Sequence, residues 1–263
     1  MKITQIPMGA HNAQLTCYLQ DPCTEMPALD RCPAILIFPG GAYAFCSDRE
    51  ADPVALAFLN AGYNAFVLRY SVSQNCPVEE VYTNAFAEAQ EAMDYLHQNA
   101  GDLHIDPEQI AVVGFSAGGH LAASVGTMGR VRPAAMLLGY AVFSVPGKAL
   151  GMELPDLLQQ VDDQTPPAFL FATQGDHLVP ATQSLQFATL LAERKIPYEM
   201  HIFAYGDHGF STGSRHIANP HNSSVRCPDP AAAAGAGPIC AAGARLPGHF
   251  GEQSAILQQQ NVR

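Results

Sequence analysis

The chain has 263 residues, of which 48% are hydrophobic and 14% charged, a composition typical of a compact globular protein with a sizeable core. The formal net charge of −11 argues against a surface for nucleic acid or anionic membranes. The apolar runs are too short to span a membrane, and the first residues lack an apolar segment of signal-peptide length. We therefore expect a cytoplasmic protein without nucleic-acid or membrane partners.

The seven cysteines are odd in number and form no Cys-x-x-Cys pair, which favours free structural thiols over a disulfide framework or a zinc site. A His-Glu-x-x-His motif or comparable ligand spacing is also missing, so the sequence predicts no bound metal. The sequence does not indicate the oligomeric state.

The first half of the chain alternates predicted strands and helices. Residues 1–20 alternate apolar and polar side chains, as an antiparallel hairpin at a sheet edge does. Residues 34–38 form a continuous apolar run, which is typical of a strand buried on both faces. A helix near 49–61, a strand at 65–70 and a long helix near 79–98 follow.

The second half continues this pattern. Further strands are expected at 109–113, 133–140, 168–173 and 198–203. A helix is expected at 181–195, and the polar, weakly periodic segment 144–167 is interpreted as a small cap insertion on the substrate side. Strands alternating with helices over this length predict an α/β fold with a mostly parallel, twisted sheet and helices on both faces.

Residues 114–120, Gly-Phe-Ser-Ala-Gly-Gly-His, lie between the apolar run at 109–113 and a helix-like run. A strand, a sharp turn and a helix with one hydroxyl at the corner match the Gly-x-Ser-x-Gly nucleophile elbow. The corner residue, Ser116, would take a strained backbone conformation, so the positions two before and two after it must lack side chains. Gly114 and Gly118 meet that demand. Taken alone, a glycine-rich turn with an incidental serine is the alternative.

Three more groups follow predicted strands: Asp176, His208 and the glycine-rich loop 39–42. In a mostly parallel sheet, the functional crevice lies beyond the carboxyl ends of the strands. We therefore expect the Ser116 hydroxyl, a carboxylate, an imidazole and a loop of free amides to meet at one edge of the sheet.

This set of groups suits acyl transfer. Ser116 is a weak nucleophile until a base removes its proton, and His208 can do so near neutral pH. Asp176 would hold the other ring nitrogen and stabilise the imidazolium. Asp207 is the rival carboxylate, but its adjacency to His208 in the sequence is poor geometry for supporting the ring from behind, so Asp176 is favoured.

Backbone amides of Gly41, Ala42 and Ala117 are predicted to form the oxyanion hole, and the chemistry requires no cofactor. The remaining histidines near these motifs are given no catalytic role. His120 is interpreted as a packed or hydrogen-bonded neighbour, His177 as a loop residue and His201 as structural.

Several motifs together resemble a known superfamily. They are Pro39-Gly40-Gly41-Ala42-Tyr43, Ser47-Asp48-Arg49-Glu50, Ile105-Asp106-Pro107, Gly114 to Leu121, Gly175-Asp176 with Val179-Pro180, and His208-Gly209-Phe210. The chain resembles the esterase branch of the α/β hydrolases, which includes hormone-sensitive-lipase-like esterases, feruloyl and acetyl xylan esterases, and kynurenine formamidase. With Pro39 before the glycines, the chain resembles bacterial enzymes described as acetyl xylan esterase-like. The resemblance implies an α/β-hydrolase fold with Ser116, Asp176 and His208 as its triad.

The sequence departs from the family pattern at two places. Ala42 stands where a third glycine is common, although its amide is retained. The family normally continues after Phe210 into a last amphipathic helix, whereas residues 211–263 here are rich in Ala, Gly and Pro without a helical apolar stripe. We therefore expect a catalytic domain at 1–210 and a poorly ordered tail at 211–263, which is either a replaced, out-of-frame terminus or a divergent one.

The predicted function is that of a serine carboxylesterase that hydrolyses short-chain acyl esters through an acyl-enzyme. Acetylated xylo-oligosaccharides are one candidate substrate. Alternatives with the same triad are an amidase, a formamidase or a peptidase. A non-catalytic receptor for a small ligand on the same fold is the alternative from a different class.

Overall fold

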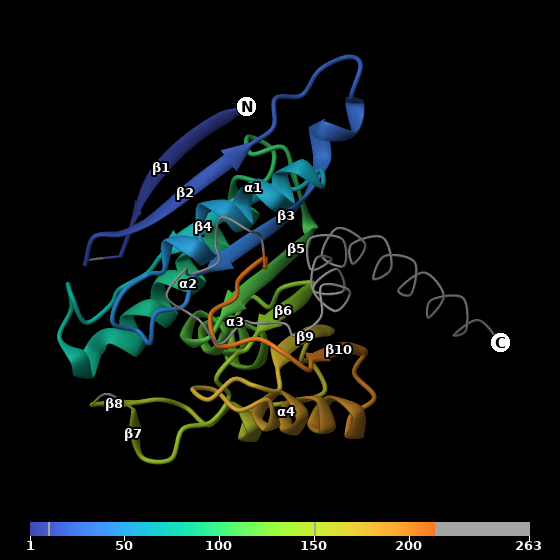
Figure 1. Ribbon diagram of the computed structural model, residues 1–263. Coiled ribbons are helices and arrows are strands. Elements are labelled where there is room, and N and C mark those ends of the chain that lie inside the picture. The colour runs from blue at the N-terminus through green and yellow to red at the C-terminus, as the bar shows by residue number, and fades with distance from the viewer. Residues whose placement is uncertain (10, 150, 214–263) are drawn as a thin grey trace.

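The computed structural model describes residues 1–9, 11–149 and 151–213 (Figure 1). An eight-stranded sheet runs through this part of the chain in the order β1-β2-β4-β3-β5-β6-β9-β10. Its strands are β1 (Lys2–Met8), β2 (Ala13–Leu19), β3 (Cys32–Phe38), β4 (Asn64–Arg69), β5 (Ile105–Phe115), β6 (Ala135–Gly139), β9 (Ala168–Thr173) and β10 (Tyr198–Phe203). Of the predicted tail at 211–263, residues 214–263 lie outside the described residues.

The sheet is antiparallel at one flank and parallel elsewhere. The hairpin of β1 and β2 pairs antiparallel, and β2 also runs antiparallel to β4. From β4 to β10 every neighbouring pair is parallel. Figure 1 shows the hairpin at one flank and β10 at the other. The predicted mostly parallel α/β sheet is confirmed, and its parallel strands all end at the same edge.

Helices cover both faces, as predicted. They are α1 (Asp52–Asn60), α2 (Val81–Gln98), α3 (Ala117–Met128) and α4 (Thr182–Glu193). Alternate residues of β3 belong to two separate hydrophobic cores. Leu36 packs in the core beneath α2, α3 and α4, whereas Ile37 packs in the core beneath α1. This division follows from the two-residue period of a strand, which places successive side chains on opposite faces.

The elbow strand is longer than its apolar run predicts. β5 begins at Ile105, where Cys32 pairs with it, and the pairing then jumps to Ala34 with Ile110. The irregular register takes up the extra residues of β5, so the Asp-Pro-Glu sequence at 106–108, which looks like a turn, lies within the strand.

The segment 144–167 contains little regular structure. It has a short hairpin of β7 (Lys148–Ala149) and β8 (Met152–Glu153), followed by the 3-10 turn η4 (Leu157–Gln159). Met152, Leu157 and Val161 are buried in the larger core. These apolar anchors attach the segment to the domain, and its role as a cap stays a prediction.

Two smaller observations bear on the class of protein. The cysteines within the described ranges, Cys17, Cys23, Cys32, Cys46 and Cys76, are free thiols. No helix of the described residues has the length and apolar character needed to cross a bilayer.

Candidate active site

Ser116 occupies the sharp corner between β5 and α3. Its backbone has φ 54° and ψ −119°, a conformation that non-glycine residues rarely adopt. Three backbone hydrogen bonds hold it there: its amide donates to Gly139 at 3.0 Å, and its carbonyl accepts from His120 at 3.0 Å and from Val142 at 3.2 Å. The strained conformation is therefore held by β6, by the first turns of α3 and by the segment that follows β6.

The two glycines of the elbow are required by close backbone contacts. A Cβ at Gly114 would lie 2.1 Å from the Gly118 carbonyl oxygen. A Cβ at Gly118 would lie 2.1 Å from the carbonyl oxygen of Phe38, at the end of β3. Both distances are shorter than any real contact, so the elbow can pack against β3 only without side chains at these positions.

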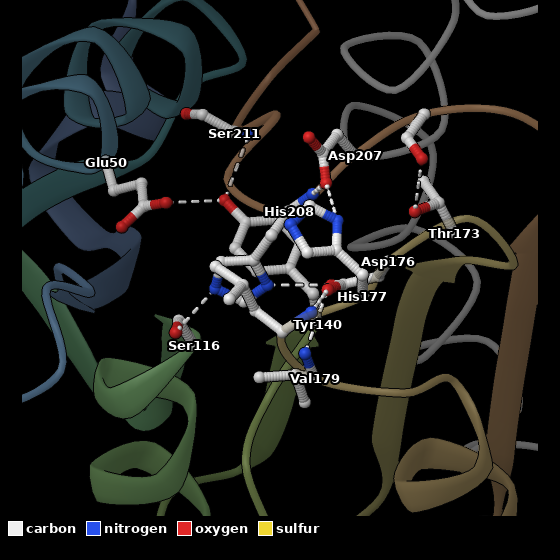
Figure 2. Close-up of polar contacts among 12 residues, drawn as sticks. Glu50, Ser116, Tyr140, Thr173, Asp176, His177, Val179, Asp207, His208 and Ser211 are labelled. Atoms are coloured by element: carbon white, nitrogen blue, oxygen red, sulfur yellow. Dashed lines mark hydrogen bonds and ion pairs between the residues drawn. The ribbon is translucent and has the colours of Figure 1, made fainter. Parts of the chain in front are cut away.

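The structure brings Ser116, His208 and Asp176 together in one chain of hydrogen bonds (Figure 2). The Ser116 Oγ lies 2.8 Å from His208 Nε2, and His208 Nδ1 lies 2.7 Å from Asp176 Oδ2. An ionised carboxylate can only accept, so Nδ1 carries the ring proton and Nε2 accepts from the serine hydroxyl. The imidazole is thus in the tautomer that can remove the proton of Ser116.

Asp176 is held as an anion by the turn that follows β9. Its Oδ1 accepts from the amides of Leu178 and Val179, each at 2.9 Å. Burial raises the pKa of this carboxyl, but the hydrogen bonds from His208 and from the two amides outweigh burial and lower the pKa below its usual range. The carboxylate is therefore charged at neutral pH.

Asp207, the rival carboxylate, lies to the side of the ring. Its Oδ1 is 2.9 Å from His177 Nδ1 and accepts from the backbone amide of His208 at 2.8 Å. Asp207 thus joins the loop after β9 to the loop after β10, whereas Asp176 contacts the imidazole itself. His177, as predicted, is a loop residue with a largely exposed side chain.

The glycine-rich loop after β3 runs directly beside the serine. A Cβ at Gly40 would lie 3.1 Å from Ser116 Cβ, and a Cβ at Gly41 would lie 2.0 Å from the Phe45 carbonyl oxygen. Gly41 has φ 128° and Ala42 has φ 56°, so Ala42 takes a left-handed conformation that costs about 1 kcal/mol more than for glycine. The loop keeps its tight turn despite the missing third glycine.

The predicted oxyanion residues thus lie on the two segments that flank Ser116. Ala117 is the first residue of α3, and Gly41 and Ala42 follow the close approach at Gly40. Amides at a helix start and in a left-handed turn are suited to bind an anion. Their part in stabilising an oxyanion stays a prediction.

His120 ties this loop to α3 and is the hydrogen-bonded neighbour that the sequence predicts. It is 1% exposed, with Nδ1 2.9 Å from the Tyr43 hydroxyl and Nε2 3.1 Å from the Pro155 carbonyl. The carbonyl can only accept, so Nε2 is protonated and Nδ1 accepts from Tyr43. Burial lowers the pKa of His120 to about 4, so the ring is neutral at physiological pH.

Sequence reasoning missed the importance of Glu50. Glu50 belongs to the motif Ser47-Asp48-Arg49-Glu50, and its side chain is buried and contacts both Gly40 and Tyr140. The one available signal was an acidic residue shortly after the glycine-rich loop, where a solvated surface position is the ordinary expectation.

Among the described residues, one group outside this site has the composition of a metal site. Ligand atoms of His11, Cys76 and Glu80 lie within 4.8 Å of one another. The Cys76 sulfur already accepts from the Asn84 amide at 3.2 Å, and we assign no metal to the group.

The strand order, the elbow and the hydrogen-bonded Ser-His-Asp chain at the carboxyl edge define an α/β hydrolase. The family profile of BD-FAE matches residues 24–137, and that of the prolyl oligopeptidase family matches residues 151–224. The chain belongs to the α/β-hydrolase esterases.

Known proteins support this assignment. MGS-M1, an α/β-hydrolase enzyme from a Medee basin deep-sea metagenome library, is 46% identical with a TM-score of 0.77, over 83% of this chain and 88% of that one. An acetyl ester-xyloside bifunctional hydrolase from Caldicellulosiruptor lactoaceticus is 33% identical with a TM-score of 0.69, over 77% and 81%. An acetylxylan esterase of Xylanibacter ruminicola is 28% identical over 77% of this chain.

The curated relatives are longer proteins. This chain spans 44% of the acetylxylan esterase and 33% of the first curated relative that it matches.

Proposed function

We propose that the chain is a serine carboxylesterase that hydrolyses short-chain acyl esters through an acyl-enzyme. The observation that carries the proposal is the hydrogen-bonded chain from Ser116 Oγ through His208 to Asp176, at 2.8 Å and 2.7 Å. The chain stands on a strained elbow at the carboxyl edge of the sheet, where the nucleophile is accessible beside a loop of turn amides.

In the acylation step, Ser116 Oγ attacks the ester carbonyl carbon while His208 Nε2 takes the hydroxyl proton. Asp176 keeps the Nδ1 proton in place and stabilises the positive charge on the imidazolium. The amides of Gly41, Ala42 and Ala117 would donate to the oxyanion. When the tetrahedral intermediate collapses, His208 gives its proton to the departing alcohol and leaves an acyl-Ser116 ester.

In the deacylation step, His208 accepts a proton from water, and the resulting hydroxide attacks the acyl carbon. The second tetrahedral intermediate then expels the serine oxygen, which regains its proton from His208. The carboxylic acid leaves, and the enzyme returns to its starting state. Besides the ester and water, each step uses side chains and amides of this chain.

Acetyl groups on xylo-oligosaccharides are the substrate that we favour. The names of two relatives, an acetylxylan esterase and an acetyl ester-xyloside bifunctional hydrolase, support this choice, because both refer to acetyl esters and to xylan or xylosides. The relatives extend beyond the region that this chain matches, so the substrate has to be measured on this chain itself.

The test is hydrolysis of acetyl, butyryl and octanoyl p-nitrophenyl esters and of acetylated xylo-oligosaccharides by wild type and Ser116→Ala. We expect the acetyl ester to react fastest, and the substitution to lower kcat by about 10⁴-fold or more, because it removes the nucleophile. Retention of wild-type turnover by Ser116→Ala would show that Ser116 is not the nucleophile.

Amide hydrolysis by the same residues is the second candidate, and the match of residues 151–224 to the prolyl oligopeptidase family favours it. That segment contains Asp176 and His208. Assays that compare an acetyl anilide and an N-formyl anilide with the acetyl ester distinguish amide hydrolysis from ester hydrolysis. Fast anilide cleavage without ester cleavage would move the assignment to amidases.

A further inference from the structure

A buried carboxylate, that of Glu50, joins the glycine-rich loop at 39–42 to Tyr140. Figure 2 shows its contact with Tyr140. Glu50 is 2% exposed. Its Oε2 accepts from the amide of Gly40 at 2.7 Å, in the loop that passes beside Ser116. Its Oε1 accepts from the Tyr140 hydroxyl at 2.6 Å.

Tyr140 carries the connection to the loop that bears His208. The amide of Ser211 donates to the Tyr140 hydroxyl oxygen at 3.0 Å, and the Ser211 hydroxyl donates to the Arg49 carbonyl at 2.7 Å. The Ser211 amide can only donate, so the Tyr140 hydroxyl oxygen accepts from it, and the hydroxyl proton is donated to the ionised Glu50 carboxylate. The direction of every bond is therefore determined, and both Glu50 oxygens act as acceptors.

The ring of Tyr140 also supports the catalytic imidazole. It lies edge-to-face against His208 with ring centroids 5.0 Å apart, and it packs on Phe210 at 4.9 Å. Tyr140 itself is buried just beyond β6, with φ 35°, and its amide donates to Phe171 at 2.6 Å. The support comes from the central sheet and does not depend on the exposed loop alone.

The charge of Glu50 acts on the same imidazole. Burial raises the pKa of Glu50 above its ordinary value, and the hydrogen bonds from Tyr140 and Gly40 and the charges of Arg49 and protonated His208 offset only part of that rise. The attraction to His208 is mutual, so an ionised Glu50 stabilises the imidazolium that forms when Ser116 loses its proton.

We propose that Glu50 and Tyr140 are positioning residues that hold the glycine-rich loop at 39–42 and His208 in register with Ser116. This role rests on the esterase function proposed above. Glu50 acts through Gly40 and Tyr140 and does not itself exchange protons with the substrate. A displacement of about 1 Å at the reacting groups costs on the order of 10²-fold in rate, so such a link affects turnover more than substrate binding.

Glu88 provides a matched control. It is also 2% exposed, and burial raises the pKa of its carboxyl as well. It likewise accepts from a backbone amide and a hydroxyl, but both belong to Ser71. Glu50 and Glu88 thus have similar burial and hydrogen bonding, and only Glu50 bonds to Gly40 and Tyr140.

The experiment compares Glu50→Gln, Tyr140→Phe and Glu88→Gln with wild type, measuring kcat, KM and the melting temperature with an acetyl ester. We expect Glu50→Gln and Tyr140→Phe to lower kcat by about 10- to 100-fold, with KM within about threefold of wild type. Glu88→Gln should lower the melting temperature about as much as Glu50→Gln does, while its kcat stays within about twofold of wild type. Wild-type kcat in Glu50→Gln, or an equal loss in Glu88→Gln, would overturn the proposal.

A second readout separates failure of this proposal from failure of the esterase function. The rate at which a fluorophosphonate labels Ser116, followed by intact mass, requires an activated serine but no turnover of an ester. Slower labelling in Glu50→Gln and Tyr140→Phe supports the positioning role even if ester substrates are poor. Labelling at the wild-type rate overturns that role, whereas an unlabelled, inactive wild type would contradict the esterase function and this proposal together.

Discussion

The two halves of the site are built in different ways. The nucleophile side consists of the elbow and α3, in the middle of the sheet, where every residue from Ala117 to Thr127 is buried. The acid–base side consists of the loops after β9 and β10, at the edge of the sheet. β10 has exposed or partly exposed side chains throughout, and Tyr205 in the loop that follows it is 62% exposed.

This difference determines what holds each group in place. Ser116 is positioned by backbone hydrogen bonds and by glycines that touch neighbouring backbone. Asp176 and His208 depend on side-chain hydrogen bonds, to turn amides, to each other and to Ser116. Substitutions on the acid–base side should therefore change rate more than stability, and substitutions on the nucleophile side should also change stability.

The largest effect on the acid–base side should come from Asp176→Asn. The amide can no longer hold the Nδ1 proton of His208 as an ionised carboxylate does, so we expect kcat to fall by about 10³- to 10⁴-fold. Steady-state kinetics with an acetyl ester measure this, with circular dichroism as the control for folding. A loss below tenfold would show that Asp176 does not orient the base.

On the nucleophile side, we expect the titration of His120 to change the free energy of unfolding by about 3 kcal/mol. Burial lowers its pKa to about 4 in the folded protein, against 6.5 for an ordinary histidine. Between these values the unfolded chain binds the extra proton, so the free energy of unfolding should decrease as pH falls from about 6.5 to about 4.

Urea unfolding at pH 7 and pH 4 measures this decrease, with His120→Gln as the control that cannot titrate. The pH-dependent loss should be smaller in the variant by about 3 kcal/mol. An equal loss in both proteins would mean that His120 is protonated in the folded state, contrary to its contacts with Tyr43 and Pro155.

The smallest effect should come from Asp207→Asn, the counterpart of Asp176→Asn. Asp207 bonds to the exposed His177 side chain and to the amide of His208, and such a partly exposed pair contributes at most about 1 kcal/mol. We expect kcat to fall by no more than about fivefold under the assay conditions used for Asp176→Asn. A loss as large as that of Asp176→Asn would reverse the assignment of the two carboxylates.

Much of the fold was predictable because its signals are local. The apolar runs at 34–38 and 168–173 correspond to β3 and β9, since a strand buried on both faces needs apolar residues at every position. The beginning of β5 was not predictable, because Asp106 and Pro107 have the local character of a turn. Only the irregular pairing with β3 accommodates them in a strand.

The same distinction between local signals and contacts of distant segments applies to the site. Ser116, Asp176 and His208 could be selected because each follows a strand, and parallel strands end at one edge. Asp207 is disfavoured because it is adjacent to His208 in the sequence. The contacts agree with this, because Asp176 bonds to the His208 ring and Asp207 bonds to the His208 backbone amide. Glu50 could not be selected, because nothing in its local sequence distinguishes a buried carboxylate from a solvated one.

By itself, the sequence determined the class of fold, the elbow and the three groups that meet at the edge of the sheet. These depend on short-range patterns: runs of apolar residues, glycines beside a strained corner, and polar residues after strands. Only the tertiary structure decided which partners these groups have, and that Glu50 and Tyr140 connect the two halves of the site. The physical reason is that burial and hydrogen bonding between residues such as Glu50 and Tyr140 arise from packing of distant segments, which local sequence does not encode.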